Sequence, residues 1–114
     1  LHNIPYEKLE HDHLLKKTVE LISKQKVVGW YQGRMEWGPR ALGNRSILGD
    51  PRSEKMKDIL NEKIKHREKF RPFAPVVCED DALNYFDCDK PVPSPTDYML
   101  MVYPIFKKWH KKTS

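Results

Sequence analysis

The chain has 114 residues, of which 39% are hydrophobic and 32% are charged, and its formal net charge is +5. This length suits one small domain or part of one, and the aromatic residues supply enough apolar surface for a core, which argues against a disordered chain. The positive charge favours acidic partners: a nucleotide, a phosphorylated metabolite or nucleic acid.

The first half of the chain predicts a helix, two short strands and a loop. Apolar residues recur at helical spacing from about residue 12 to residue 24. The β-branched and aromatic run at 27–31 predicts a buried strand. Residues 33–49 form a glycine- and arginine-rich loop, in which Pro39 is expected to open one helical turn and Gly43 to close it. A second short strand is expected at 46–48, inside the end of this range.

The second half continues the alternation of helix and strand. Asp50 and Pro51 suit the N-cap and the first position of a helix, so a helix is expected to begin there. The pattern further predicts a strand at 74–78, a short helix at 80–86, a loop at 87–97 and a last strand at 98–103. We therefore predict an α/β (α+β) fold, with helices packed against a twisted mixed sheet.

Cysteine and histidine usage gives no sign of a metal centre or a disulfide framework. Cys78 and Cys88 lack zinc-ligand spacing and are expected to be reduced thiols in a cytoplasmic protein. His11 and His13 are two residues apart and do not share a helix face, so no metal site is expected there. No apolar run approaches the ~20 residues of a membrane span. Leu1 is not a natural start, so we expect more chain before it.

The arginines are confined to one third of the chain, whereas the lysines are spread over all of it. Arginine offers a planar fork that holds phosphates and carboxylates with two parallel hydrogen bonds, so this confinement indicates an anion-binding site. The alternative is that the arginines pair with carboxylates nearby, and the residues alone leave both interpretations open. The six arginines are Arg34, Arg40, Arg45, Arg52, Arg67 and Arg71.

Two segments concentrate these cations, the 33–49 loop and the 65–73 segment. The loop has neither a Walker A ending nor a Gly-x-Gly-x-x-Gly fingerprint, so on its own it favours a structural turn over a ligand site. In the 65–73 segment, Lys65 is suited to act as a point charge on a phosphate and Arg71 as a fork. Spacing alone slightly favours a solvated helix end whose cations complement the dipole.

Taken together, the two segments resemble a known family. Residues 27–52, VVGWYQGRMEWGPRALGNRSILGDPR, are followed in register by Met56-Lys57-Asp58, by 61–68 and by Phe70-Arg71-Pro72-Phe73-Ala74-Pro75. This pattern is similar to the signature of the O-carbamoyltransferases that act on nodulation factors and antibiotics. The resemblance runs from about residue 12 to residue 103.

The resemblance implies a partial carboxy-terminal, YrdC-like domain over 1–114. The amino-terminal Kae1-like domain, with the family's iron site, is absent from this chain and would be its partner in the same polypeptide. Such enzymes are ATP-dependent: they form carbamoyl-adenylate from carbamoyl phosphate and ATP, usually with magnesium, and transfer the carbamoyl group to an acceptor hydroxyl. Family chains also continue beyond the equivalent of Ser114, so the 114 residues alone are expected to be inactive.

The resemblance also implies which side chains bind the substrates. Arg40, Lys65 and Arg71 are expected to contact the phosphate or carbamoyl-adenylate group, and Arg45 and Ser46 are secondary candidates. No side chain is assigned as a nucleophile, because phosphate and adenylyl transfer depend mainly on positioning and electrostatics. The 33–49 loop and the 65–73 segment are expected to line one basic concavity.

A basic YrdC-like module that binds RNA without catalysis is the competing interpretation. The chain lacks the aromatic-interleaved and helix-turn-helix signatures of nucleic-acid binders. A binder of the phosphate backbone also has no need to gather its arginines in one segment. We therefore expect small-molecule substrates, and neither nucleic acid nor a membrane as a partner.

Overall fold

The computed structural model describes residues 3–90 and 92–110 and confirms an α+β chain. Within this part, β1 and β2 pair in an antiparallel sheet, and three α-helices are present. In order, the elements are α1 (His11–Ser23), β1 (Val28–Tyr31), β2 (Arg45–Leu48), α2 (Met56–Ile59), the π-helical turn η1 (Leu60–Ile64), α3 (Glu79–Tyr85) and the 3₁₀ turns η2 (Ser94–Tyr98) and η3 (Lys107–Trp109). The predicted helix at 12–24, the strands at 27–31 and 46–48 and the helix at 80–86 are thus confirmed.

The chain divides into two compact units. The first comprises Leu1–Tyr31 and Ser46–Pro72, and it contains α1, the sheet apart from Arg45, α2 and η1. The second comprises Gln32–Arg45 and Phe73–Ser114, and it contains the loop between the strands, α3, η2 and η3. Each unit is described by itself below.

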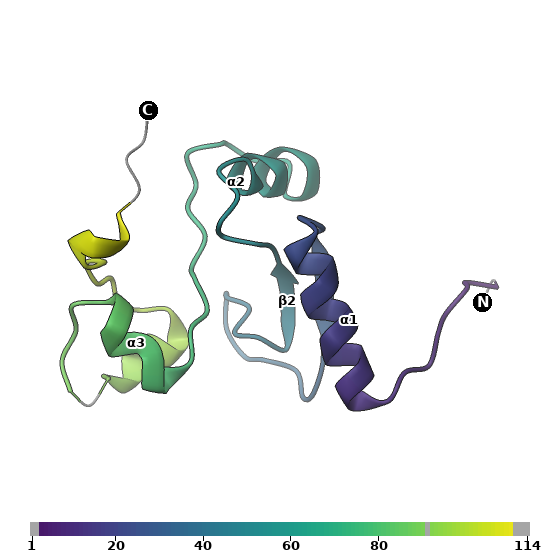
Figure 1. The fold of residues 1–114 in the computed structure, drawn as a ribbon, viewed down its shortest axis with the longest axis horizontal. Helices are drawn as coiled ribbons and strands as arrows, with labels where there is room; N and C mark the ends of the chain where they lie inside the picture. The colour runs from purple at the N-terminus through teal and green to yellow at the C-terminus, as the bar shows by residue number, and fades with distance from the viewer. Residues whose placement is uncertain (1–2, 91, 111–114) are drawn as a thin grey trace. The chain divides into compact units, whose positions relative to one another are not determined.

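In the first unit, α1 packs along β1 (Figure 1). The helix ends through a left-handed residue, Gln25, whose φ is 61°. The backbone N–H of Lys26 donates to the carbonyl of Leu21 at 3.0 Å, which satisfies a carbonyl that the helix end would otherwise leave unpaired. After this reversal, the Nε2 of Gln25 donates a hydrogen bond to Asp50, which lies just after the end of β2.

The helix predicted to begin at Asp50 begins instead at Met56. Asp50 is 2% exposed, and its carboxylate accepts from the backbone N–H of Arg52 and from Gln25, so it closes a turn and does not cap a helix. Gly49 precedes this turn, where a Cβ would lie 2.9 Å from the Sδ of buried Met56. A larger residue at this position would therefore force the Met56 side chain to shift.

The second unit is held by contacts between α3 and the end of the described chain. Phe86 and Ile105 form an isolated antiparallel bridge, and the backbone N–H of Asp87 donates to Pro104 at 2.9 Å. The Nε1 of Trp109 donates to the carbonyl of Asn84, and its ring lies 5.1 Å from that of Tyr85. Ala82 is buried on α3.

The strands predicted at 74–78 and 98–103 are wrong. Residues 74–78 have no regular structure, and the η2 turn occupies Ser94–Tyr98 and ends at left-handed Met99, whose φ is 56°. β-branched and aromatic residues suit a strand only where another strand pairs with it, and in the described chain neither run has one. Of the loop predicted at 87–97, residue 91 lies outside the described residues and 94–97 belong to η2.

The helical turn predicted at Pro39 is also wrong, because residues 38–40 form bends. Gly38 has a φ of 108° and Gly43 a φ of 115°, which no helical turn contains. The glycines therefore serve a loop conformation that other residues rarely adopt.

Candidate functional site

The glycine-arginine loop, residues 33–45 of the second unit, is closed by one carboxylate. The Oε1 of Glu36 accepts hydrogen bonds from the backbone N–H groups of Leu42 at 2.8 Å and Asn44 at 3.0 Å. The Nδ2 of Asn44 in turn donates to the carbonyl of Arg34 at 3.0 Å. These hydrogen bonds close the backbone of the five residues between Glu36 and Leu42 into a loop. The second oxygen of Glu36, Oε2, is buried without a hydrogen-bond partner.

Arg45 stabilises the same loop from its other end. Its guanidinium donates to the backbone carbonyls of Gln32, of Gly33 at 3.3 Å and of Asn44 at 2.8 Å. All three of these acceptors are backbone oxygens in the loop or directly before it. The geometry gives this predicted substrate ligand a role in holding the loop.

Arg40 is one of the five residues between Glu36 and Leu42, and it lines a cavity. Its side chain is exposed and makes no hydrogen bond or ion pair with residues 3–90 or 92–110. The cavity is open and has a volume of about 230 Å³, and Trp37, which is 97% exposed, forms part of its wall. An apolar hollow beside a cation suits a ligand with both a planar and an anionic part. The lining residues, all in the second unit, are Trp37, Pro39, Arg40, Leu42, Tyr98 and Leu100.

The lysine-arginine segment, residues 65–71 of the first unit, follows the π-helical turn η1. The N–H of Lys65 donates to the carbonyl of Leu60 at 2.9 Å, which completes the π-type turn. His66 is then left-handed, with a φ of 48°, and the N–H of Arg67 donates back to the carbonyl of Asn61 at 2.9 Å. This reversal directs the chain away from the helix axis.

A buried amide holds the rest of this segment. Asn61 is 0% exposed, and its Nδ2 donates to the carbonyls of Lys69 at 3.2 Å and Arg71 at 2.9 Å. Its Oδ1 accepts from the Nε of Arg67 at 2.8 Å. One side chain thus binds three residues of the segment.

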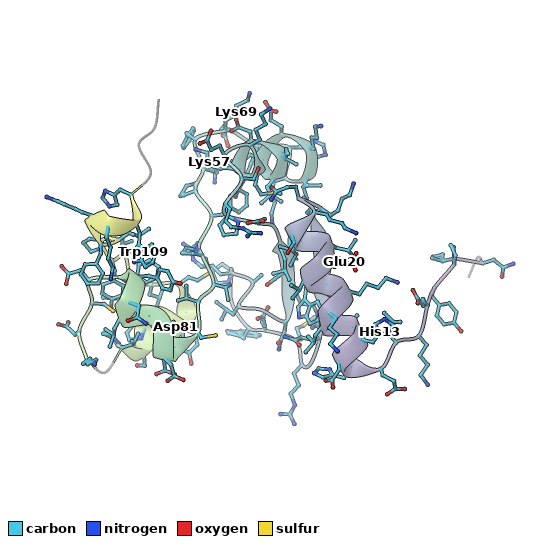
Figure 2. All side chains as sticks on the ribbon, in the orientation of Figure 1. His13, Glu20, Lys57, Lys69, Asp81 and Trp109 are labelled. Atoms are coloured by element: carbon cyan, nitrogen blue, oxygen red, sulfur yellow. The ribbon has the colours of Figure 1, made fainter. Side chains whose placement is uncertain are left out.

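The cations of the segment differ in how they are paired. The Oε1 of Glu62 lies 2.5 Å from the ammonium of Lys69 and raises the pKa of that lysine, which is labelled in Figure 2. Arg71 donates through Nε to Glu68 at 3.0 Å, which leaves its terminal nitrogens directed elsewhere. The pKa of Glu68 is lowered, first by its own backbone N–H and then by Arg71. The side chain of Lys65 is exposed, and its ammonium has no hydrogen bond or ion pair within the described chain.

Asp50 and Arg52 form the most buried charge contact of the first unit. The Nη2 of Arg52 lies 2.6 Å from Oδ2 of Asp50, and its Nε lies 2.9 Å from Oδ1. These bonds, with the Arg52 backbone N–H and Gln25, lower the pKa of Asp50 to about 2, against the effect of burial. Arg52 is therefore engaged by an internal carboxylate, as the pairing interpretation of the arginines expected.

The predicted site residues fall in both units. Arg40 and Arg45 belong to the second unit, and Ser46, Lys65 and Arg71 belong to the first. Ser46 is half-buried on β2. The single basic concavity expected from the two segments stays a prediction, because the segments lie in different units.

The sequence interpretation missed the two residues that organise these segments, Glu36 and Asn61. Glu36 was considered only as an ion-pair partner for arginine, whereas it binds backbone N–H groups. Asn61 follows the apolar positions of a predicted helix, where asparagine has low propensity. The available signal was a residue of low helix propensity, Asn61, next to the apolar face of the predicted helix.

Two absences hold for the described residues only. Among 3–90 and 92–110, no three His, Cys, Asp or Glu side chains are grouped so as to hold a metal ion. In the same part of the chain, no helix has the length and apolar character that crossing a bilayer requires.

Comparison with known proteins places these segments in context. The family model described as the carbamoyltransferase C-terminus matches residues 19–114. The uncharacterized protein sll1178 of Synechocystis is 50% identical over 97 residues, which are 85% of this chain and 15% of that protein. Nodulation protein NolNO of Sinorhizobium fredii is 53% identical over 76 residues, covering 67% of this chain and 11% of that protein. Nodulation protein U of the same species is 43% identical over 98 residues, covering 86% and 16%. The chain thus spans less than a fifth of the length of these curated relatives.

Proposed function

Because the chain belongs to the carbamoyltransferase C-terminus family, we propose that it forms part of an ATP-dependent enzyme that makes carbamoyl-adenylate and passes the carbamoyl group to an acceptor hydroxyl. Family membership supports carbamoyl transfer in general, and the adenylate route is the proposal. Within this route, the chain binds the phosphate-bearing substrates.

The observation that carries the proposal is the contrast between engaged and unengaged cations. Arg45, Arg52 and Arg67 donate to groups of the protein itself. The side chains of Arg40 and Lys65, in contrast, are exposed, and their charged groups have no partner in the described part of the chain. Internal hydrogen bonds hold the loop that carries Arg40 and the segment that carries Lys65. The backbone at each of these cations is therefore fixed. Fixed cations without internal partners are what a polyanionic ligand requires.

The proposed chemistry makes this charge necessary. Water releases inorganic phosphate from carbamoyl phosphate, the carbamate oxygen then bonds to the α-phosphorus of ATP, and pyrophosphate leaves. Both substrates are polyanions and repel one another, so cations must neutralise them before the reacting atoms can meet. Magnesium enters as part of the ATP complex.

Each predicted residue has a place in this scheme. Arg40 and Lys65 bind phosphate oxygens, and Arg71 adds its terminal nitrogens while Glu68 holds Nε. Arg45 maintains the glycine-arginine loop that carries Arg40. Ser46 is the remaining candidate for a hydrogen bond to the ligand.

Calorimetric titration of the chain with carbamoyl phosphate and with Mg-ATP tests the proposal. Arg40→Ala and Lys65→Ala are expected to weaken at least one of the two by on the order of tenfold or more, the typical effect of losing a charge-assisted hydrogen bond. Arg34→Ala and Lys63→Ala are the matched controls, because they remove the same charges from exposed positions that the proposal does not use.

The outcomes separate a defined site from general basicity. Equal losses in the variants and the controls, together with salt-sensitive binding of a generic RNA, would favour the nucleic-acid module over the enzyme. No binding of either substrate by the folded chain would contradict the assignment of these residues.

A further inference from the structure

We propose that Asn61 is a positioning residue, whose buried amide holds the lysine-arginine segment in the conformation in which Lys65 and Arg71 bind phosphate. The inference rests on the proposed function of these two cations. It concerns a residue that need not touch substrate at all.

The first support is the completeness of the hydrogen bonding at Asn61. Both donor hydrogens have acceptors, at Lys69 and Arg71, and the acceptor oxygen has a donor at Arg67. A side-chain amide is the neutral group that supplies two donors and an acceptor in one plane. Asn61 is 0% exposed, so loss of its amide would leave these buried groups without solvent to replace the three bonds.

The second support is where the three bonds are made. The amide reaches the backbone on either side of Phe70, and it reaches the guanidinium of Arg67 near the segment's start. A second bond joins the backbone of Asn61 to that of Arg67. The positions of residues 67, 69 and 71 are therefore tied to one point on η1.

The third support is that the local backbone is in an uncommon conformation. η1 is a π-helical turn, a form that is rare and often found at functional sites. The next residue but one, His66, is left-handed without being glycine. Such conformations persist where surrounding contacts impose them, and the Asn61 bonds supply that constraint.

The consequence for binding is geometric. The carbonyl of Arg71 is fixed 2.9 Å from the Asn61 amide, so its Cα and the root of its side chain are fixed as well. The N–H of Lys65 is fixed by Leu60, on the same turn that carries Asn61. Loss of the amide donors releases the Arg71 end while the Lys65 end stays in place.

Asn61→Asp is the discriminating variant, because it keeps the acceptor for Arg67 and replaces the donor group that faces two carbonyls. We expect its affinity for carbamoyl phosphate, and for inorganic phosphate as a simpler probe, to fall on the order of 10- to 100-fold, the typical effect of losing a hydrogen bond to a charged group. Amide hydrogen exchange over residues 67–71 is expected to quicken in the same variant. Asn61→Ala serves if the aspartate variant does not fold.

Met56→Ala is the matched control, since Met56 is buried on the preceding turn and makes no side-chain hydrogen bond to the segment. It is expected to lower stability while the folded protein retains wild-type phosphate affinity. Faster exchange in Asn61→Asp with unchanged affinity would overturn the inference and leave the proposed function intact. Absence of binding by the wild-type chain would instead remove the proposed function, and the inference with it.

Discussion

The glycine-arginine loop and the lysine-arginine segment present cations by opposite means. The loop is closed by a charged side chain, Glu36, and by glycines with positive φ, and one carboxylate oxygen is left without a partner. The segment is held by a neutral amide, Asn61, whose hydrogen-bonding groups are all used. The difference teaches that some residues of a basic cluster hold the backbone, while others expose their charge to a ligand. Only the contacts that each residue makes show to which of the two groups it belongs.

The largest expected effect comes from breaking the neutral anchor. Asn61→Ala removes three hydrogen bonds and leaves buried polar groups without partners, so the free energy of unfolding should fall by about 3 kcal/mol. Urea unfolding at neutral pH measures it. A loss below that of an exposed substitution such as Lys57→Ala would contradict the assigned anchoring.

Breaking the charged anchor should cost less. Glu36→Ala removes one acceptor shared by two backbone N–H groups that lie near solvent, so a loss of about 1–2 kcal/mol is expected. Hydrogen exchange should quicken at Leu42 and Asn44 and stay unchanged at Arg67 and Arg71. Faster exchange in both regions would mean that the two anchors act as one structure.

The loop's dependence on glycine sharpens the comparison further. Gly43→Ala places a side chain at a φ of 115° and should lower stability by about 1 kcal/mol or somewhat more. Gly29→Ala is the matched control, because a Cβ at either position meets no atom within 4 Å and only Gly43 has positive φ. Thermal unfolding of both variants tests whether backbone conformation alone accounts for the difference.

In the segment, the corresponding left-handed position carries His66, so the reverse substitution should help. His66→Gly relieves a left-handed cost of about 1–2 kcal/mol and adds a backbone entropy cost of about 0.5–1 kcal/mol. The expected net gain is therefore roughly 0.5 kcal/mol, measured by urea unfolding. A loss of stability would show that the His66 side chain makes a contribution larger than this strain.

The last prediction concerns the acid range, where protonation of the Asp50 carboxylate should lower the stability of the folded chain. The folded pKa of Asp50, about 2, lies below its ordinary value of 3.8, so its stabilising contribution is complete above pH ~5 and declines as the pH falls from about 4 to 2. Unfolding midpoints recorded across this range should fall in the wild type. Asp50→Asn should flatten the part of the profile that this carboxylate causes, and an unchanged profile would contradict the assignment.

Sequence periodicity was sufficient where a local pattern determines the structure. The apolar spacing of α1, the β-branched residues of β1 and the acidic first turn of α3 each predicted the observed element. The strands expected at 74–78 and 98–103 failed because pairing depends on a partner strand, which local propensity does not encode. Asp50 failed as a helix cap because its carboxylate binds Arg52 and Gln25.

The substrate-binding roles of the two segments stay predictions, whereas the roles of several arginines within the protein are visible in the structure. The confinement of arginine indicated an anion site, yet Arg45, Arg52 and Arg67 bind the protein itself. Their sequence neighbours did not reveal this, because two of the three bind groups more than five residues away. The resemblance proposed Arg40 and Lys65, and these are exposed and unpaired within the residues described.

The π-helical turn has a consequence for how this stretch tolerates changes in length. Such a turn contains one residue more than an α-helical turn, and each helical residue advances about 100° around the axis. Removing a single residue between Leu60 and Lys65 would convert the turn to ordinary α-helix. The residues that follow would then leave the helix in a different direction around its axis. Substitutions on the exposed face leave that direction unchanged. The number of residues in η1, together with the buried amide of Asn61, therefore sets the direction in which the following cations emerge.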